Sequence, residues 1–252
     1  MINTLECQLI NIVIPMAGHG SRFSRAGYTD PKPLIPVHGK PMIEVVINNL
    51  TPSCEHRFIF ICQAEHLHDY PLRNLLEEKS PGCKILEVSR VTEGAACTVL
   101  LAKQYINNAD QLMIANCDQY VEIDINQYLN SLRPNMDGLI MTMKENQDKW
   151  SYIELNQHNK IIRVVEKEVV SDEATVGIYN YLHGADFIVA AEAMIAKNLR
   201  VNNEFYVAPT YNEMIARGKT IAYFNIGRLG HGMHGLGTPE DLKNFIARIN
   251  QL

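Results

Sequence analysis

The sequence contains no long apolar run and no excess of basic residues. None of its 252 residues lies in an apolar stretch near 18 residues long, which is the length that a membrane-spanning helix requires. The chain also begins without the basic region of a secretory signal peptide. Lys and Arg number 23 against 28 Asp and Glu, a net charge of -5. We therefore expect no membrane segment and no general attraction for nucleic acid or anionic lipid.

The cysteine pattern excludes a disulfide framework and a cysteine-rich zinc site. The six cysteines are scattered, and no two are spaced as C-x-x-C. Several lie in apolar runs, which is typical of reduced, buried thiols. We expect a cytoplasmic protein. The sequence also offers no Ser-His-Asp or Cys-His arrangement for nucleophilic catalysis.

The composition is that of an ordinary globular protein, with 46% apolar and 20% charged residues. In the first half, apolar runs that predict strands alternate with stretches of helical spacing. The expected strands are 9–15, 57–62, 84–88 and 111–115, and the expected helices are 41–50, 67–78 and 95–106. This alternation predicts an α/β fold with a mostly parallel sheet.

In the second half the alternation of strands and helices stops, and several short strands are expected in succession. Strands are expected at 139–143, 152–155, 161–165, 176–181 and 221–225, with helices at 185–196, 205–216 and 239–249. Short strands joined by turns indicate antiparallel pairing. The whole chain therefore predicts a mixed central sheet flanked by helices, with a small β-rich region added in the second half.

A turn rich in small residues follows the first expected strand. Glycines let backbone N–H groups approach phosphate oxygens. Arg22 follows, and its planar guanidinium can donate two parallel hydrogen bonds to a phosphate. A dinucleotide fingerprint needs a glycine where Phe23 stands, and a P-loop needs a Gly-Lys-Ser/Thr that is absent. This is a nucleotide-binding loop of another kind. The residues expected to bind the nucleotide here are Met16, Ala17, Gly18, Gly20 and Ser21.

Lys32 is enclosed by two prolines, Pro31 and Pro33. Prolines fix the backbone on both sides and so aim a single cation. We expect Arg22 and Lys32 to be the catalytic cations that hold the phosphates.

This block resembles the sugar-1-phosphate nucleotidyltransferases, or nucleoside-diphosphate-sugar pyrophosphorylases. The matching motifs are the glycine turn and arginine of 18–22, the Pro-Lys of 31–32 and the Gly-Lys-Pro-Met of 39–42. The resemblance continues in weaker pieces to the end of the chain. It implies a Rossmann-like nucleotidyltransferase fold in one domain, 1–252. It also implies a nucleotide-binding half, about 1–135, and an acceptor-binding half, about 136–252.

Asp118 ends the apolar run that starts at Leu112. A carboxylate at the end of a central strand is well placed to hold a divalent cation beside phosphates. The family has an aspartate here, so Asp118 is expected to bind Mg²⁺. The family's second metal aspartate falls on Gly235, and His231 and His234 nearby are poor ligands for Mg²⁺.

The acceptor is expected to meet an element that resembles the family's Glu-Lys-Pro. There Lys167 would contact the acceptor phosphate and Glu166 the sugar, with Glu168 where proline is usual. A plain ion pair at a strand end is the alternative. Glu204 matches a family acid, and Tyr152 is expected to line the same cleft.

The base-reading segment of the family resembles residues 90–96. We expect Glu93, Gly94 and Ala95 to contact the nucleobase. A carboxylate accepts hydrogen bonds and cannot donate, so Glu93 favours the amino group of cytosine, or next that of guanine. Alternatively Glu93 only caps the following helix.

The resemblance implies a Mg²⁺-dependent transfer of a nucleoside monophosphate from a triphosphate to a phosphorylated small molecule, releasing pyrophosphate. Glu93 makes CTP the favoured triphosphate. A sugar 1-phosphate is the expected acceptor, in surface-polysaccharide synthesis, and the enzyme could form a homo-oligomer. Three alternatives stay open: a cytidylyltransferase acting on a phosphorylated amine, alcohol or amino acid, a glycosyltransferase, and a regulatory nucleotide-binding module. A glycosyltransferase would want an Asp-x-Asp where 116–118 reads Asn-Cys-Asp.

Overall fold

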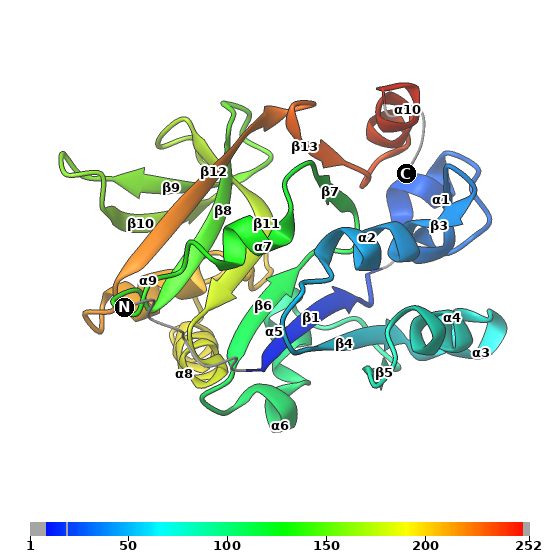
Figure 1. The fold of residues 1–252 in the computed structure, drawn as a ribbon, viewed down its shortest axis with the longest axis horizontal. Helices are drawn as coiled ribbons and strands as arrows, with labels where there is room; N and C mark the ends of the chain where they lie inside the picture. The colour runs from blue at the N-terminus through cyan, green and yellow to red at the C-terminus, as the bar shows by residue number, and fades with distance from the viewer. Residues whose placement is uncertain (1–8, 19, 249–252) are drawn as a thin grey trace.

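The computed structural model describes residues 9–18 and 20–248. Its main feature is an eleven-stranded mixed sheet (Figure 1). Nine of the strands are neighbours in the order β5-β4-β1-β6-β11-β8-β12-β13-β7. Strands β9 and β10 pair with each other beside β11. The predicted α/β class is confirmed, and so is the mixed character of the sheet.

The first-half strands form the parallel part of the sheet. They are β1 (Ile10–Met16), β4 (His56–Gln63), β5 (Lys84–Val88) and β6 (Gln111–Ala115). Strand β1 pairs in parallel with β4 on one side and β6 on the other. The chain therefore reverses its direction of travel across the sheet at β1. In such sheets ligands bind beyond the carboxyl ends of the strands at this point.

The remaining strands extend the same sheet into the second half of the chain. They are β7 (Gln119–Val121), β8 (Gly138–Lys144), β9 (Ser151–Leu155), β10 (Ile161–Glu166), β11 (Glu173–Tyr181), β12 (Ile221–Leu229) and β13 (Gly232–Gly235). Strand β11 runs antiparallel between β6 and β8. The two halves proposed from the sequence thus share one continuous sheet. A separate two-stranded ribbon is formed by β2 (Pro36–Val37) and β3 (Lys40–Pro41).

Helices cover both faces of the sheet because alternate strand residues are apolar on each face. One core contains Ile12 and Ile14 of β1 and packs against α2 (Met42–Leu50), α4 (Leu72–Lys79) and α7 (Ile125–Leu129). The other contains Val13. It packs against α5 (Ala95–Leu100), α6 (Lys103–Ile106), α8 (Gly184–Ala196) and α9 (Thr210–Ile215). Successive residues of β1 thus belong to opposite cores, as the alternation of side chains along a strand requires.

A third apolar cluster joins the last helix to the loops after β1. Helix α10 (Pro239–Arg248) contributes Leu242 and Phe245. These side chains pack with Phe23 of α1 (Ser21–Arg25) and with Ile35, which follows the short 3₁₀ turn η1 (Lys32–Leu34). Figure 1 shows α10 above α1 at the same end of the molecule. Residues from the end of the described chain therefore pack against the two turns that carry Arg22 and Lys32.

Three helix predictions were wrong in extent. The stretch 67–78 forms two helices, α3 (Ala64–Asp69) and α4, because Pro71 interrupts the helical hydrogen bonds. The stretch 95–106 divides into α5 and α6, where tighter i to i−3 bonds replace the α-helical ones. The helix expected from 205 begins only at Thr210. The backbone of Phe205 bonds to Glu93 and Ala96 instead.

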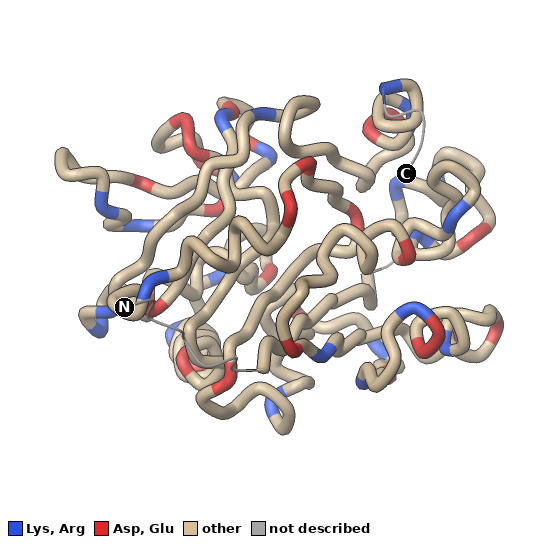
Figure 2. The backbone as a smooth tube through the Cα atoms, in the orientation of Figure 1, with Lys and Arg blue, Asp and Glu red and all other residues tan. Residues whose placement is uncertain are grey.

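Other boundaries lie close to those expected. Pro41 precedes α2 as its cap rather than occupying its first turn, and Ile249 of the last expected helix is outside the described residues. In the described part of the chain, no helix is both long enough and apolar enough to span a membrane. Figure 2 shows acidic and basic segments interspersed around the fold. This agrees with the absence of a basic excess in the sequence.

One polar contact from α2 completes the hydrogen bonding of β7. The Asn49 side chain donates to the Val121 carbonyl and accepts from the Val121 N–H, both at 2.8 Å. Val121 is buried. Asn49 therefore replaces a neighbouring strand on that edge of β7.

Asn49→Ala should lower the free energy of unfolding by about 2 kcal/mol, because both backbone groups of Val121 lose their partner. Urea unfolding would measure this. The exposed neighbour provides a matched control, and Asn48→Ala should change stability by no more than about 0.5 kcal/mol. Equal effects of the two substitutions would contradict the role given to Asn49.

Candidate active site

The loop after β1 lies at the carboxyl edge of the parallel strands. Its Ala17 carbonyl accepts a hydrogen bond of 2.8 Å from Nε2 of Gln63, at the end of β4. Gly20 caps α1 with a φ of 61°, in the left-handed region that favours glycine. A Cβ on Gly20 would also lie 3.2 Å from the Cβ of Lys32. The glycine thus brings the loop against Lys32. His19 of the expected turn is outside the described residues.

Lys32 and Asp118 meet at the point where β1 and β6 end. The Lys32 Nζ donates to Oδ2 of Asp118 at 2.5 Å, although the two residues are 86 positions apart. About a fifth of each side chain is exposed, 22% and 19%. The structure therefore brings together the expected catalytic cation and the expected metal ligand in one partly open ion pair.

The charge of Lys32 is stabilised by this pairing. Burial by itself lowers the pKa of a lysine, but the Asp118 carboxylate outweighs it, and the pKa of Lys32 is raised. Arg22 on α1 lies close enough to oppose that rise by charge repulsion. Lys32 is thus an ammonium throughout the physiological range. Two cations, Lys32 and Arg22, thus lie close enough to interact next to the glycine loop.

The donor set around Asp118 fits a cation that arrives with a nucleotide. A Cβ on Gly237 would lie 2.4 Å from Oδ2 of Asp118, so only glycine leaves room for this carboxylate. The N–H of Leu236 also fixes the Asp118 backbone carbonyl at 2.7 Å. Among the described residues no group of three or more His, Cys, Asp and Glu is placed to hold a metal. Mg²⁺ is commonly held by one carboxylate, substrate phosphates and water.

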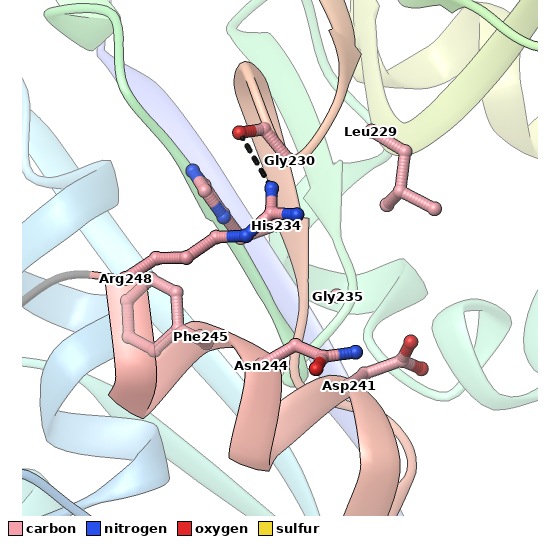
Figure 3. A pocket seen from close by; sticks show the side chains of 8 residues that line it. All are labelled: Leu229, Gly230, His234, Gly235, Asp241, Asn244, Phe245 and Arg248. Carbon is pink, nitrogen blue, oxygen red and sulfur yellow. Dashed lines mark hydrogen bonds between the residues drawn. The ribbon is translucent and has the colours of Figure 1, made fainter.

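Gly235 faces a different carboxylate, which belongs to Asp241. A Cβ on Gly235 would lie 3.4 Å from Oδ2 of Asp241. That oxygen accepts from the Thr238 hydroxyl at 2.7 Å, in a cap of α10. Gly235 and Asp241 line a small pocket of about 160 Å³ together with His234 and Arg248 (Figure 3).

His234 has a structural partner in that region. Its Nε2 lies 2.6 Å from Oε1 of Glu122, and its side chain is only 5% exposed. The hydrogen bond from His234 lowers the pKa of Glu122. The imidazole is therefore engaged with Glu122.

The base-reading segment is packed against the backbone of Phe205. Gly94 has a φ of 132°, and a Cβ on it would lie 2.4 to 2.9 Å from the N, C and O atoms of Phe205. The Phe205 N–H donates to the Glu93 carbonyl at 2.8 Å, and the Phe205 carbonyl accepts from the Ala96 N–H at 3.0 Å. These contacts fix the predicted nucleobase segment to the second half of the chain.

The Glu93 carboxylate has a partner that the sequence did not suggest. Arg200 Nη2 donates to Glu93 Oε2 at 2.5 Å, and the guanidinium carbon lies 4.2 Å from the ring centroid of Phe205. The cap of α5 is Gly94, so the alternative that Glu93 caps this helix is wrong. The Glu93 side chain is 64% exposed, and its second oxygen can still accept from a ligand.

Lys167 lies at the end of β10 and borders an open pocket of about 990 Å³. Its Nζ donates to the Tyr206 hydroxyl at 2.6 Å, and this hydrogen bond raises the pKa of Lys167. The buried Glu166 carboxylate accepts from the Ser151 hydroxyl, and burial raises the pKa of Glu166. Glu204 is close enough to act on both charges. The structure thus groups these three predicted acceptor residues.

Tyr152 requires a correction. Its side chain is completely buried in the core, and its hydroxyl donates to the Gln147 carbonyl at 2.7 Å. Tyr152 is one of three successive buried residues of β9 and belongs to an apolar core, so it does not line the acceptor pocket.

Four residues that shape the site were missed in the sequence. Gln63, Arg200 and Tyr206 act through contacts between distant segments, and no local pattern marks them. Gly177 did carry a signal, because a glycine within an apolar strand indicates a bulge or a close approach. It has a φ of 78°, and a Cβ on it would lie 2.3 Å from Nδ2 of Asn116.

Known proteins are similar in sequence to most of this chain. The family model described as Nucleotidyl transferase matches residues 12–224. The chain is 30% identical over 175 residues to the Bifunctional protein GlmU of Methanococcus maripaludis, covering 68% of this chain and 39% of that protein. It therefore spans about two fifths of the length of this curated relative. It is also 37% identical over 84 residues to a 2-aminoethylphosphonate cytidylyltransferase of Lancefieldella rimae, covering 33% of this chain and 32% of the other.

A solved structure matches nearly the whole fold. The nucleoside-diphosphate-sugar pyrophosphorylase of Vibrio cholerae RC9 superimposes with a TM-score of 0.77 and 28% identity. The match covers 94% of this chain and 99% of that one. This confirms the predicted Rossmann-like fold.

Lys32→Met should raise the affinity of the nucleotide-free protein for Mn²⁺ about tenfold, because it frees the Asp118 carboxylate from a charged hydrogen bond. Electron paramagnetic resonance of free Mn²⁺ measures this binding without any turnover. Asp118→Asn should abolish the gain when added to Lys32→Met. Arg25→Met, which removes an exposed cation from α1, serves as the control. An unchanged affinity in Lys32→Met would place the metal elsewhere.

Proposed function

The chain belongs to the nucleotidyl transferase family, and on that basis we propose that it transfers a nucleoside monophosphate from a triphosphate to a phosphorylated small molecule. The observation that carries this proposal is the contact between Lys32 and Asp118, 2.5 Å apart beside the glycine loop. This contact supports the proposal because it joins a cation and a carboxylate where β1 and β6 end, which is the usual nucleotide position in such sheets.

In the proposed reaction, a phosphate oxygen of the acceptor attacks the α-phosphorus of the triphosphate. A new P–O bond forms as the bond between the α-phosphorus and the bridging oxygen breaks, and pyrophosphate leaves with that oxygen. The attacking oxygen is already an anion, so no general base is required. The protein then acts by positioning and by charge neutralisation.

Three side chains are assigned to that task. Arg22 and Lys32 neutralise the triphosphate and the departing pyrophosphate, and Lys167 binds the acceptor phosphate. Family members generally use a divalent metal, and Asp118 would hold Mg²⁺ together with phosphate oxygens of the nucleotide. When bound, the ion adds further charge neutralisation at those phosphates.

A sugar 1-phosphate is the acceptor we favour. It is supported by the similarity to the Vibrio cholerae nucleoside-diphosphate-sugar pyrophosphorylase along nearly the whole chain. The placement of Glu166 next to Lys167 suits an acceptor with a phosphate and a neighbouring hydroxyl, since a carboxylate accepts from hydroxyl groups.

The second candidate is a cytidylyltransferase whose acceptor carries an amine. It is favoured by two observations. One is the partial similarity to the Lancefieldella rimae 2-aminoethylphosphonate cytidylyltransferase. The other is that two carboxylates, Glu166 and Glu204, act on each other beside Lys167, which suits a ligand with an anionic and a cationic end.

A substrate matrix would test these proposals. CTP, UTP, dTTP, GTP and ATP are each mixed with sugar 1-phosphates and with phosphorylated or phosphonylated amines, and released pyrophosphate is measured. We propose that CTP is used best and that Glu93→Gln alters the base ranking. Strong use of UTP or dTTP would contradict the proposed base. Absence of pyrophosphate from every combination would contradict the proposed function.

Lys32→Ala should lower turnover by about 10²- to 10³-fold, because a cation that stabilises the departing charge contributes several kcal/mol to transition-state binding. Asp118→Ala should nearly abolish the metal-dependent rate. Steady-state pyrophosphate release at saturating triphosphate measures both effects.

The matched control is Arg25→Ala, which removes an exposed cation from α1. It should leave turnover close to that of the parent protein. Unchanged kinetics in Lys32→Ala would remove this lysine from the mechanism.

A further inference from the structure

Lys167 occupies an unfavourable backbone position that needs support. Its φ is 58°, in the left-handed region that a lysine rarely adopts. Its N–H donates to the Trp150 carbonyl at 3.0 Å, which fixes the backbone at the end of β10. The backbone alone does not fix the ammonium at the end of the long side chain, and the Glu166 and Glu204 carboxylates are both within its electrostatic reach. An ion pair with either one would neutralise the charge that an acceptor phosphate requires.

Tyr206 gives the ammonium a neutral partner instead. Its hydroxyl accepts from Nζ of Lys167 at 2.6 Å, and the same Nζ lies 4.8 Å from the centre of the Tyr206 ring. Both distances place the ammonium at the hydroxyl end of the Tyr206 side chain. A phenol does not cancel the positive charge, whereas a carboxylate would. The lysine can therefore keep its remaining donors for an anion.

Tyr206 is itself held in place through its neighbour. Phe205 is buried, and its backbone bonds to the Glu93 carbonyl and the Ala96 N–H. Gly94 presses on that backbone with no room for a side chain. The position of Tyr206 is therefore set by the same segment that is proposed to contact the nucleobase.

We infer that Tyr206 is a positioning residue, which holds the Lys167 ammonium in the acceptor pocket and keeps it out of an ion pair with Glu166 or Glu204. This inference rests on the proposed function, in which Lys167 binds the acceptor phosphate. Tyr206 acts on the acceptor through Lys167 and not on the nucleotide, so its loss has a specific kinetic signature.

Tyr206→Phe tests the inference, because it removes the hydroxyl and keeps the ring. We expect the KM of the acceptor to rise about tenfold, as the loss of one hydrogen bond to a charged group implies. The KM of the triphosphate and kcat should change by less than about twofold. Tyr70→Phe, in the half-buried linker between α3 and α4, is the matched control and should change none of these constants.

A double-mutant cycle separates positioning from a general structural effect. Lys167→Met should raise the acceptor KM further than Tyr206→Phe, and adding Tyr206→Phe to Lys167→Met should cause no further rise. An unchanged acceptor KM in Tyr206→Phe would overturn the inference. So would an equal rise in the KM of both substrates, or effects that multiply in the double variant.

Nitrogen NMR of the lysine ammonium groups keeps the inference testable without activity. In the nucleotide-free protein, Tyr206→Phe should lower the pKa of Lys167, because the phenol hydrogen bond is lost. If the parent protein releases no pyrophosphate but the pKa falls, the placement of Lys167 by Tyr206 stands and the proposed function fails. If the pKa is unchanged, the inference itself is overturned.

Discussion

The ion pair between Lys32 and Asp118 is the interaction on which the proposed nucleotide site depends. Each partner comes from a short segment that is fixed by other contacts: Lys32 by its prolines and Asp118 by the strand that precedes it. Two charges at the edge of a sheet are costly to leave without partners. Each here has the other, at 2.5 Å, with enough exposure for a ligand to enter. In the proposed function, a bound triphosphate and its metal ion replace this ion pair. The phosphates then contact Lys32, and the metal ion contacts Asp118.

A second constraint joins the two halves of the chain. The backbone of Phe205 occupies the space that a side chain on Gly94 would need. The elements expected to bind base and acceptor therefore share one set of backbone hydrogen bonds and cannot shift independently. Arg200 strengthens this connection by touching both Glu93 and the Phe205 ring. Such an arrangement relates the two expected substrate positions through hydrogen bonds and packing.

The sequence predicted the parts of this protein whose signal is local. Short apolar runs located β1 and the other central strands, and the proline pair singled out Lys32. Position at the end of an apolar run identified Asp118. The prediction that Tyr152 lines the acceptor cleft was wrong. The sequence does not distinguish a strand tyrosine that faces the core from one that faces a cleft. The partners Arg200 and Tyr206 were not predictable, since their roles arise only when a loop more than thirty positions away from its contact folds back onto it.

The third apolar cluster has a consequence for the order of events during synthesis. Phe23 and Ile35 flank the turns that carry Arg22 and Lys32, and both are covered by Leu242 and Phe245 of α10. The ribosome delivers α10 more than two hundred residues after those turns. Until it emerges, Phe23 and Ile35 have only their early neighbours Val37, Met42 and Val45 in this cluster, even though β1, β4 and β6 can already pair. The parallel strands β1, β4 and β6 can therefore form well before the apolar cluster that supports Arg22 and Lys32 is complete.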